Sequence, residues 1–140
     1  RRRFSGPFLD RFDVRVLVHR PGVDELLGDE VGENTESVAL RVVRTQSIAR
    51  ERQGMLNARL SGELLDQFAP VSESGMSLLR SELEIGRLTG RGLHRVRRVA
   101  RTLADRDMHE GAITERYIAA ALALRARIAP RRGDDVRQVV

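Results

Sequence analysis

The clearest hydrophobic pattern in the chain lies in residues 88–106, LTGRGLHRVRRVARTLADR. Apolar residues recur there at steps of three and four, which is the spacing of one face of an amphipathic helix. They are Leu93, Val96, Val99, Ala100, Leu103 and Ala104. Thr89 with Gly90 marks the expected start of this helix, and residues 105–107 mark its end. The opposite face is rich in arginine, at Arg91, Arg95, Arg97, Arg98 and Arg101.

Two further helices are predicted before this stretch. The first covers about residues 37–52 and ends at Gln53 and Gly54. Its inward residues are expected to be Val38, Val42, Ile48 and Ala49. The second is short, because Ser61 is a good N-cap residue and Pro70 stops the helix.

The remaining helices complete a bundle. One is expected to begin at Ser74 or Gly75 and to end near Gly86. The last begins after Thr114, carries Ile128 on its inward side and ends at Pro130. Residues 37–129 are therefore predicted to form a mainly α domain, a small antiparallel bundle of four or five helices.

The N-terminal part of the chain has a different character. Gly6 and Pro7 indicate a turn, and residues 8–12 are long enough for one helical turn. Residues 13–18 alternate between apolar and polar, as a short strand does. Because a lone strand is unstable, we expect its sheet to lie upstream of the chain. Residues 21–36 are predicted to be a linker, and residues 130–140 a disordered tail.

Composition excludes several kinds of chemistry. The chain has 140 residues and no cysteine, so disulfides and thiolate metal sites are impossible. All 25 basic residues are arginine, so no phosphate-binding P-loop, which needs a lysine, lies in this sequence. The histidines share no ligand spacing, and we expect no metal site. No signal peptide or membrane-spanning run is visible, so we expect a cytoplasmic protein without a membrane partner.

Short motifs resemble those of magnesium-chelatase-like AAA+ ATPases. Residues 6–13, GPFLDRFD, are similar to the segment that carries the arginine finger in this family. Residues 89–93, TGRGL, followed by VARTLAD at 99–105, are similar to its sensor-2 helix. GENT at 32–35, RERQ at 50–53 and LNA at 56–58 favour the bacterial ComM-like or YifB-like branch. One departure is the link of Gly54 and Met55, where the family often has a longer basic stretch.

The resemblance implies a helical lid that follows an α/β ATPase core, of which residues 1–20 are the last helical turn and strand. It implies that Arg11 is an arginine finger that reaches the ATP site of a neighbouring subunit. Arg91 would be the sensor-2 residue that contacts an ATP phosphate, and Arg95 is a weaker candidate for that contact. ATP and Mg²⁺ are the implied cofactors of the full-length protein. The chain alone lacks the Walker motifs, so we expect it to be inactive and to bind neither.

The implied partners are the upstream core, the neighbouring subunits of a homo-oligomeric ring, and DNA. DNA remodelling is the expected work of the ring, whereas the chelatase relatives insert Mg²⁺ into a porphyrin. Both outputs are compatible with the motifs in this sequence.

Residue chemistry agrees with these roles and leaves alternatives open. A guanidinium offers paired hydrogen bonds to phosphate, and a helix N-terminus such as that at Arg91 favours anions. Residue chemistry alone favours Arg11 as a surface arginine that pairs with Asp10 or Asp13, and the motif match is what favours the arginine finger. We interpret Arg95 and Arg98 as part of a solvated face. A different class of function is a stand-alone basic module that binds nucleic acid through residues 91–101.

Overall fold

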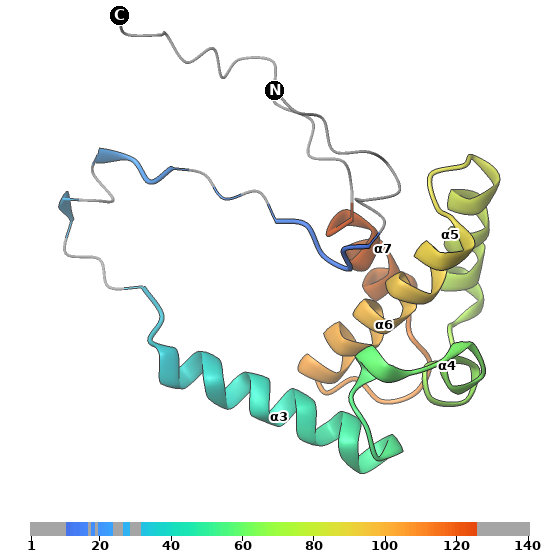
Figure 1. The fold of residues 1–140 in the computed structure, drawn as a ribbon, viewed down its shortest axis with the longest axis horizontal. Coiled ribbons are helices and arrows are strands. Elements are labelled where there is room, and N and C mark those ends of the chain that lie inside the picture. The colour runs from blue at the N-terminus through green and yellow to red at the C-terminus, as the bar shows by residue number, and fades with distance from the viewer. Residues whose placement is uncertain (1–10, 17, 19, 24–26, 29–31, 126–140) are drawn as a thin grey trace, which may run out of the picture.

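Helix α6 lies at the centre of the fold, and the other helices are arranged around it (Figure 1). The computed structural model describes residues 11–16, 18, 20–23, 27–28 and 32–125. The helices are α3 Thr35–Gln53, the 3-10 turn η1 Asn57–Arg59, α4 Gly62–Phe68, α5 Glu73–Glu84, α6 Gly90–Arg106 and α7 Glu115–Ala123. The prediction of a small, mainly α bundle is therefore confirmed.

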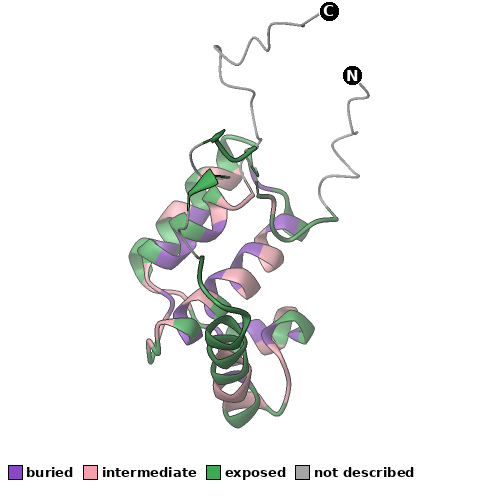
Figure 2. Cartoon of the chain, turned by 90° about the vertical axis from the view of Figure 1, so that its left-hand side faces the viewer, coloured by how far each residue is buried: buried purple, intermediate pink, exposed green. Residues whose placement is uncertain are grey.

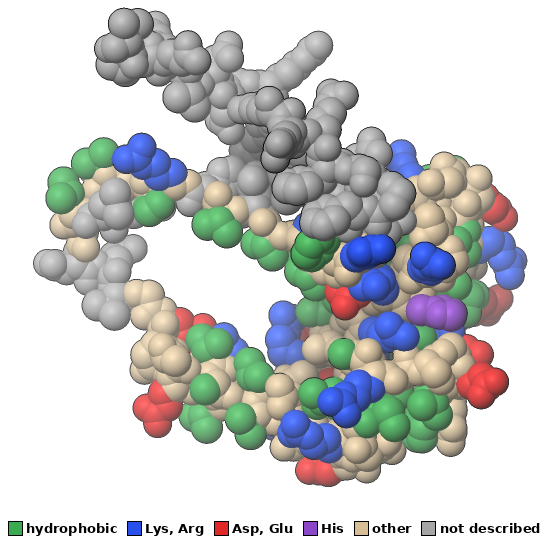
Figure 3. All heavy atoms as spheres, in the orientation of Figure 1, with side chains coloured by type: hydrophobic (Ala, Val, Ile, Leu, Met, Phe, Trp, Pro, Cys, Tyr) green, Lys and Arg blue, Asp and Glu red, His purple; other side chains and the backbone are tan. Residues whose placement is uncertain are grey.

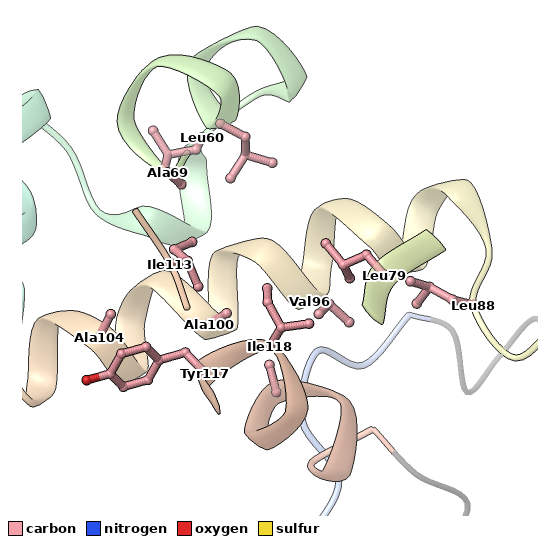
Figure 4. Packing of buried hydrophobic residues seen from close by; sticks show 12 residues of the cluster. Leu60, Ala69, Leu79, Leu88, Val96, Ala100, Ala104, Ile113, Tyr117 and Ile118 are labelled. Atoms are coloured by element: carbon pink, nitrogen blue, oxygen red, sulfur yellow. The ribbon is translucent and has the colours of Figure 1, made fainter. Parts of the chain in front are cut away.

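The core is built on the apolar stripe of α6. Val96, Ala100 and Ala104 have no exposed surface, as their spacing predicted. Helix α7 packs along this stripe through Ile118, and α5 packs in turn against α7. Leu79 of α5 lies beside Val96 in the same buried cluster (Figure 4). Fully burying a side chain of the size of leucine stabilises a fold by about 1.5–3 kcal/mol. The stripe is therefore the main source of cohesion among these short helices.

The predicted caps organise the ends of the helices. The Thr89 hydroxyl accepts a hydrogen bond from the Gly92 amide at 3.0 Å, and Ser61 caps α4 in the same way. Gly54 ends α3 in the left-handed region, with a φ of 73° that a residue with a Cβ adopts only at a cost. These local signals place three helix ends at the predicted residues.

One helix start differs from the prediction. Helix α5 begins at Glu73 rather than at Ser74 or Gly75. The reason is that Ser72, an earlier serine, is the N-cap: its Oγ accepts a hydrogen bond from the Gly75 amide at 3.2 Å. Sequence alone offers two serines two positions apart, and either could cap.

The predicted strand at residues 13–18 is not formed by residues 13–16 or 18, which the structure describes. A strand needs a neighbour to receive its hydrogen bonds, and the described residues offer none there. The Arg15 amide instead donates to the Leu124 carbonyl at 2.7 Å. The predicted turn at residues 8–12 falls mainly outside the described residues, as do Ile128 and Pro130.

Helix α3 packs on the bundle only through its C-terminal half. Ala49 is 2% exposed, whereas Val38 and Val42, which were predicted to face inward, are 39% and 48% exposed. The N-terminal turns of α3 project beyond α6 and are exposed (Figures 1 and 2). The prediction failed for these two valines because the helix is longer than the surface on which it packs.

Candidate functional site

The start of α6 presents Arg91 to solvent. Gly90 and Gly92 flank this residue, and the first turn of a helix carries outward-pointing amides and a partial positive charge. Apart from its chain neighbours and the adjoining backbone of α6, no heavy atom of the described residues lies within 4 Å of the position that a Cβ would take at Gly90. At Gly92 a Cβ would come within 3.0 Å of Leu88 Cδ1, which means that packing explains this glycine.

The segment that contains Arg11 lies at the same end of α6. Arg95, one turn after Arg91, donates from Nη1 to the Arg11 carbonyl at 2.9 Å. The same nitrogen donates to Asp13 Oδ1 at 2.6 Å. The structure therefore brings the backbone of one proposed phosphate-contacting arginine close to the helix turn that carries the other.

The interpretation of Arg95 and Arg98 as a solvated face is wrong. Arg95 is bound to Asp13, and its side chain is 28% exposed. Arg98 donates from Nε to the Leu60 carbonyl at 2.8 Å and holds the link between η1 and α4 against α6. Both side chains are therefore engaged in contacts within the domain.

Two further arginines of the predicted basic face are buried. Arg97 is 7% exposed and donates from Nη2 to the carbonyls of Leu65 and Ala69. These are carbonyls at the end of α4, where a cation is favourable. Its Nη1 pairs with Asp66 at 2.7 Å. Helix α6 is thus surrounded by protein on a side that sequence periodicity assigned to solvent.

Arg101 belongs to a buried network around Asp105, which has no exposed surface. Arg52 binds both carboxylate oxygens, at 2.6 and 2.9 Å. Arg101 donates from Nε at 2.9 Å, and Asn57 donates from its amide at 2.7 Å. The Asn57 oxygen in turn accepts from Arg52 and Gln53, both at 2.9 Å. One carboxylate thereby joins α3, the η1 turn and α6.

Burial sets the electrostatics of this network. Desolvation lowers the pKa of Arg101, the Asp105 carboxylate opposes that change, and the nearby charge of Arg52 adds to it. Arginine nevertheless remains charged at every relevant pH. The network therefore has a structural role, because all of its donors are turned toward protein acceptors.

The segments RERQ, LNA and VARTLAD were recognised in the sequence only as family motifs. Their contact in the fold, through Arg52, Asn57 and Asp105, was not predicted. The available signal was Asp105 itself, which follows the apolar stripe of α6 and lies four residues after Arg101. A carboxylate next to such a stripe is buried only with a cationic partner. Its second arginine, Arg52, is 53 positions away and is not detectable from periodicity.

A cleft opens between α3 and the turn after α6. Its apolar walls include Ile48, Phe68 and Pro70, and Met108 at its edge adopts a φ of 56°. Two of the arginines that line the cleft, Arg52 and Arg101, are already bound to Asp105. Arg44 is the other arginine of its lining, so among the described residues the cleft offers no free pair of cations for a phosphate.

No group of three His, Asp or Glu side chains that could hold a metal ion occurs among the described residues. His94 packs beside Gly62, and the His109 ring lies 3.0 Å from the Ala112 carbonyl. His19 lies outside the described residues. Of the helices in the described part of the chain, none combines the length and the apolar character that crossing a bilayer requires.

The helical domain built around these arginines has known relatives. The family model described as "Magnesium chelatase, subunit ChlI C-terminal" matches residues 32–125. The chain therefore belongs to this family of C-terminal domains. The match begins just before α3 and ends just after α7, so it covers every helix described above.

Individual bacterial proteins are similar to the chain over most of its length. It is 34% identical to Competence protein ComM of Haemophilus influenzae over 128 residues, 90% of this chain and 25% of the relative. It is 36% identical to the uncharacterized protein YifB of Escherichia coli over 126 residues, 89% of this chain and 24% of the relative. The mycobacterial protein Rv2897c is 39% identical over 107 residues, 74% of this chain and 21% of the relative.

The chain is thus a ComM-like and YifB-like member of the family. It spans about a quarter of the length of the curated relatives that it matches. The resemblance inferred from the sequence motifs is confirmed at this level.

Proposed function

We propose that this chain is the lid portion of an AAA+ ATPase and that Arg91 contacts an ATP phosphate as the sensor-2 residue. One observation carries the proposal: Arg91 is the arginine of α6 that makes no hydrogen bond or ion pair with the described part of the chain. The other arginines of this helix are all engaged, namely Arg95, Arg97, Arg98, Arg101 and Arg106. An exposed guanidinium at a helix N-terminus is suited to an anion.

Arg11 is the proposed arginine finger for the ATP site of a neighbouring subunit in a homo-oligomeric ring. Its side chain is exposed, and its backbone is held by Arg95. A finger arginine stabilises the charge that develops on the transferred phosphoryl group and accelerates hydrolysis by roughly 10³–10⁵ in well-studied NTPases. ATP and Mg²⁺ would be bound by the upstream core, whose presence the greater length of the relatives supports.

The proposed work of the ring is DNA remodelling. One relative is named a competence protein, and competence is the uptake of DNA, so this likeness supports a DNA partner rather than a porphyrin. The alternative of a stand-alone nucleic-acid module finds less support, because Arg97 and Arg101 are 7% and 3% exposed and donate to protein acceptors. Those two cations are not available to neutralise phosphates, and phosphate neutralisation is what supplies non-specific affinity.

The test is ATP hydrolysis by the full-length protein. Arg91→Ala and Arg11→Ala should each lower kcat about 10³-fold. The helix content measured by circular dichroism should stay unchanged. Arg87→Ala is the matched control, because this exposed arginine lies just before α6 and its only recorded partner among the described residues is Glu82, at 3.7 Å. Wild-type turnover in the Arg91→Ala variant would refute the sensor-2 assignment.

Mixing the two inactive variants tests which subunit supplies each arginine. If Arg11 acts on the neighbour and Arg91 on its own subunit, a mixed ring contains some complete sites and regains activity. If both act on the neighbouring subunit, every site lacks one of them and no activity returns. A second mixture combines Arg11→Ala with a variant that lacks the Walker lysine of the proposed core, and it tests the role of Arg11 alone. Recovered activity supports action of Arg11 across subunits, and no recovery at any mixing ratio contradicts it.

A further inference from the structure

The segment that carries Arg11 is attached to the rest of the domain at consecutive residues. Arg95 Nη1 donates to the Arg11 carbonyl at 2.9 Å and to Asp13 Oδ1 at 2.6 Å. Between these two acceptors, the Phe12 carbonyl accepts from Arg125 Nη1 at 2.8 Å. The acceptor segment and its two arginines are thus joined by three hydrogen bonds.

Residue 15 adds a further attachment to the end of α7. Its amide donates to the Leu124 carbonyl at 2.7 Å, and its guanidinium donates to the Arg125 carbonyl at 3.1 Å. The contacts of Arg95 and Arg125 join positions 82 to 113 residues apart. They are therefore tertiary contacts, which local chain geometry alone would not produce.

We propose that Arg95 is a positioning residue for Arg11, supported by Arg125. Together these residues hold residues 11–13 against the end of α6 that presents Arg91, so that both proposed phosphate-contacting guanidiniums keep a fixed relative position. We call Arg95, Arg125 and their acceptors in residues 11–13 the arginine clamp. The catalytic consequence of the clamp rests on the proposed function, whereas the clamp as a structural element does not.

Arg95 suits this role better than direct contact with a phosphate. Its Nη1 is directed at a carbonyl and a carboxylate two residues apart, so it fixes the direction of the backbone as well as its distance. The Asp13 charge also opposes the approach of an anion. The ion pair is part-exposed, at 28% and 48%, and a pair of this kind is weak by itself. The hold therefore depends on several bonds formed together by planar guanidiniums.

The first experiment measures the clamp without any assumption about ATP. Because the chain has no cysteine, Val14→Cys and Ala119→Cys introduce two unique spin-label sites at exposed positions, and Val14 lies between the clamped residues and Arg15. In the parent chain we expect a narrow distribution of distances between the labels. Arg95→Gln and Asp13→Asn should each replace the narrow peak by a broad distribution, whereas Arg87→Gln should not. Circular dichroism confirms that each variant remains folded.

An unchanged distance distribution in folded Arg95→Gln chains would overturn the proposal. So would a distribution that is already broad in the parent chain, because the segment would then not be held. These outcomes are independent of hydrolysis, so they separate failure of the clamp from failure of the proposed function.

The second experiment measures ATP hydrolysis in the full-length protein. A displacement of about 1 Å at a reacting centre can cost roughly 10²-fold in rate, so Arg95→Gln should lower kcat by about 10- to 100-fold with little change in KM. Asp13→Asn should produce a similar or smaller loss, because it removes one of the two bonds of Arg95. The double variant should be no worse than Arg95→Gln alone, because Arg95→Gln already removes both bonds.

Direct contact of Arg95 with ATP predicts a different pattern. In that case Arg95→Gln would raise KM for ATP, and Asp13→Asn, which only frees Arg95, would leave kcat near the parent value. This pattern would overturn the positioning role. If the unaltered full-length protein hydrolyses no ATP, the proposed function fails, and the distance measurement decides the clamp.

Discussion

Replacing Asp105 by asparagine should destabilise the domain more than the same change at other aspartates. The carboxylate has no exposed surface and accepts four hydrogen bonds, two from Arg52, one from Arg101 and one from Asn57. Asparagine has the same shape but no charge, and it turns one of the two acceptor atoms into a donor that faces other donors. The substitution therefore leaves buried guanidinium charge without a counter-charge.

The expected magnitude follows from the burial of the partners. Removing one member of a buried ion pair costs about 3–5 kcal/mol, because the other charge remains desolvated. The Arg101 side chain is 3% exposed and cannot turn to solvent, whereas that of Arg52 is 25% exposed and can recover part of its hydration. We therefore expect a loss of about 3–4 kcal/mol, which is large against the roughly 5–15 kcal/mol that stabilise a domain.

Urea unfolding followed by circular dichroism measures this loss. With an m value of about 1–3 kcal/mol/M, a loss of about 3–4 kcal/mol should lower the transition midpoint of Asp105→Asn by roughly 1–4 M at an unchanged slope. Asp107→Asn is the matched control, because Asp107, just after α6, also pairs with two arginines, Arg106 and Arg116, but their side chains are 56% and 73% exposed. A midpoint for Asp105→Asn within error of that control would refute the reasoning.

Two further predictions concern stability. Hydrogen bonding and charge from Arg106, with a smaller contribution from Arg116, hold the pKa of Asp107 below its ordinary value of 3.8. The stability that this carboxylate contributes is therefore present above pH 3.8 and is lost as the pH falls through the lowered pKa. The urea midpoints of the parent chain and Asp107→Asn should accordingly differ at neutral pH and converge in acid; a constant difference would contradict this. Gly54→Ala should cost about 1–2 kcal/mol in the same assay, because Gly54 ends α3 with a φ of 73°, and an unchanged midpoint would show that this turn adapts.

Local sequence signals identified the helices because each signal acts within a few residues. Thr89 and Ser61 cap their helices through amides three positions away, and Gly54 ends α3 through its own backbone freedom. Val96 and Ala104 are buried because steps of three and four return to one face of a helix. The same locality explains the error at α5, where two nearby serines compete for one capping role.

The proposed site was predictable only in part. Arg91 follows from its position in a recognised motif, and the structure adds that it is the arginine of α6 left without a partner in the described part of the chain. The role of Arg95 was not predictable, because its partner Asp13 is 82 positions away. Periodicity reports which residues share a face, but it does not report what covers that face.

By itself, the sequence determined the helical class, most helix ends, the apolar stripe of α6 and the family, since propensity, capping and motif spacing are properties of short segments. Tertiary structure alone decided which arginines are free. It buried Arg97 and Arg101 and tied Arg95 to the Arg11 segment. It also left hydrophobic side chains of α3 on the surface (Figure 3). The physical reason is that a guanidinium is compatible with water, a carbonyl or a carboxylate, and only packing determines which of these it meets.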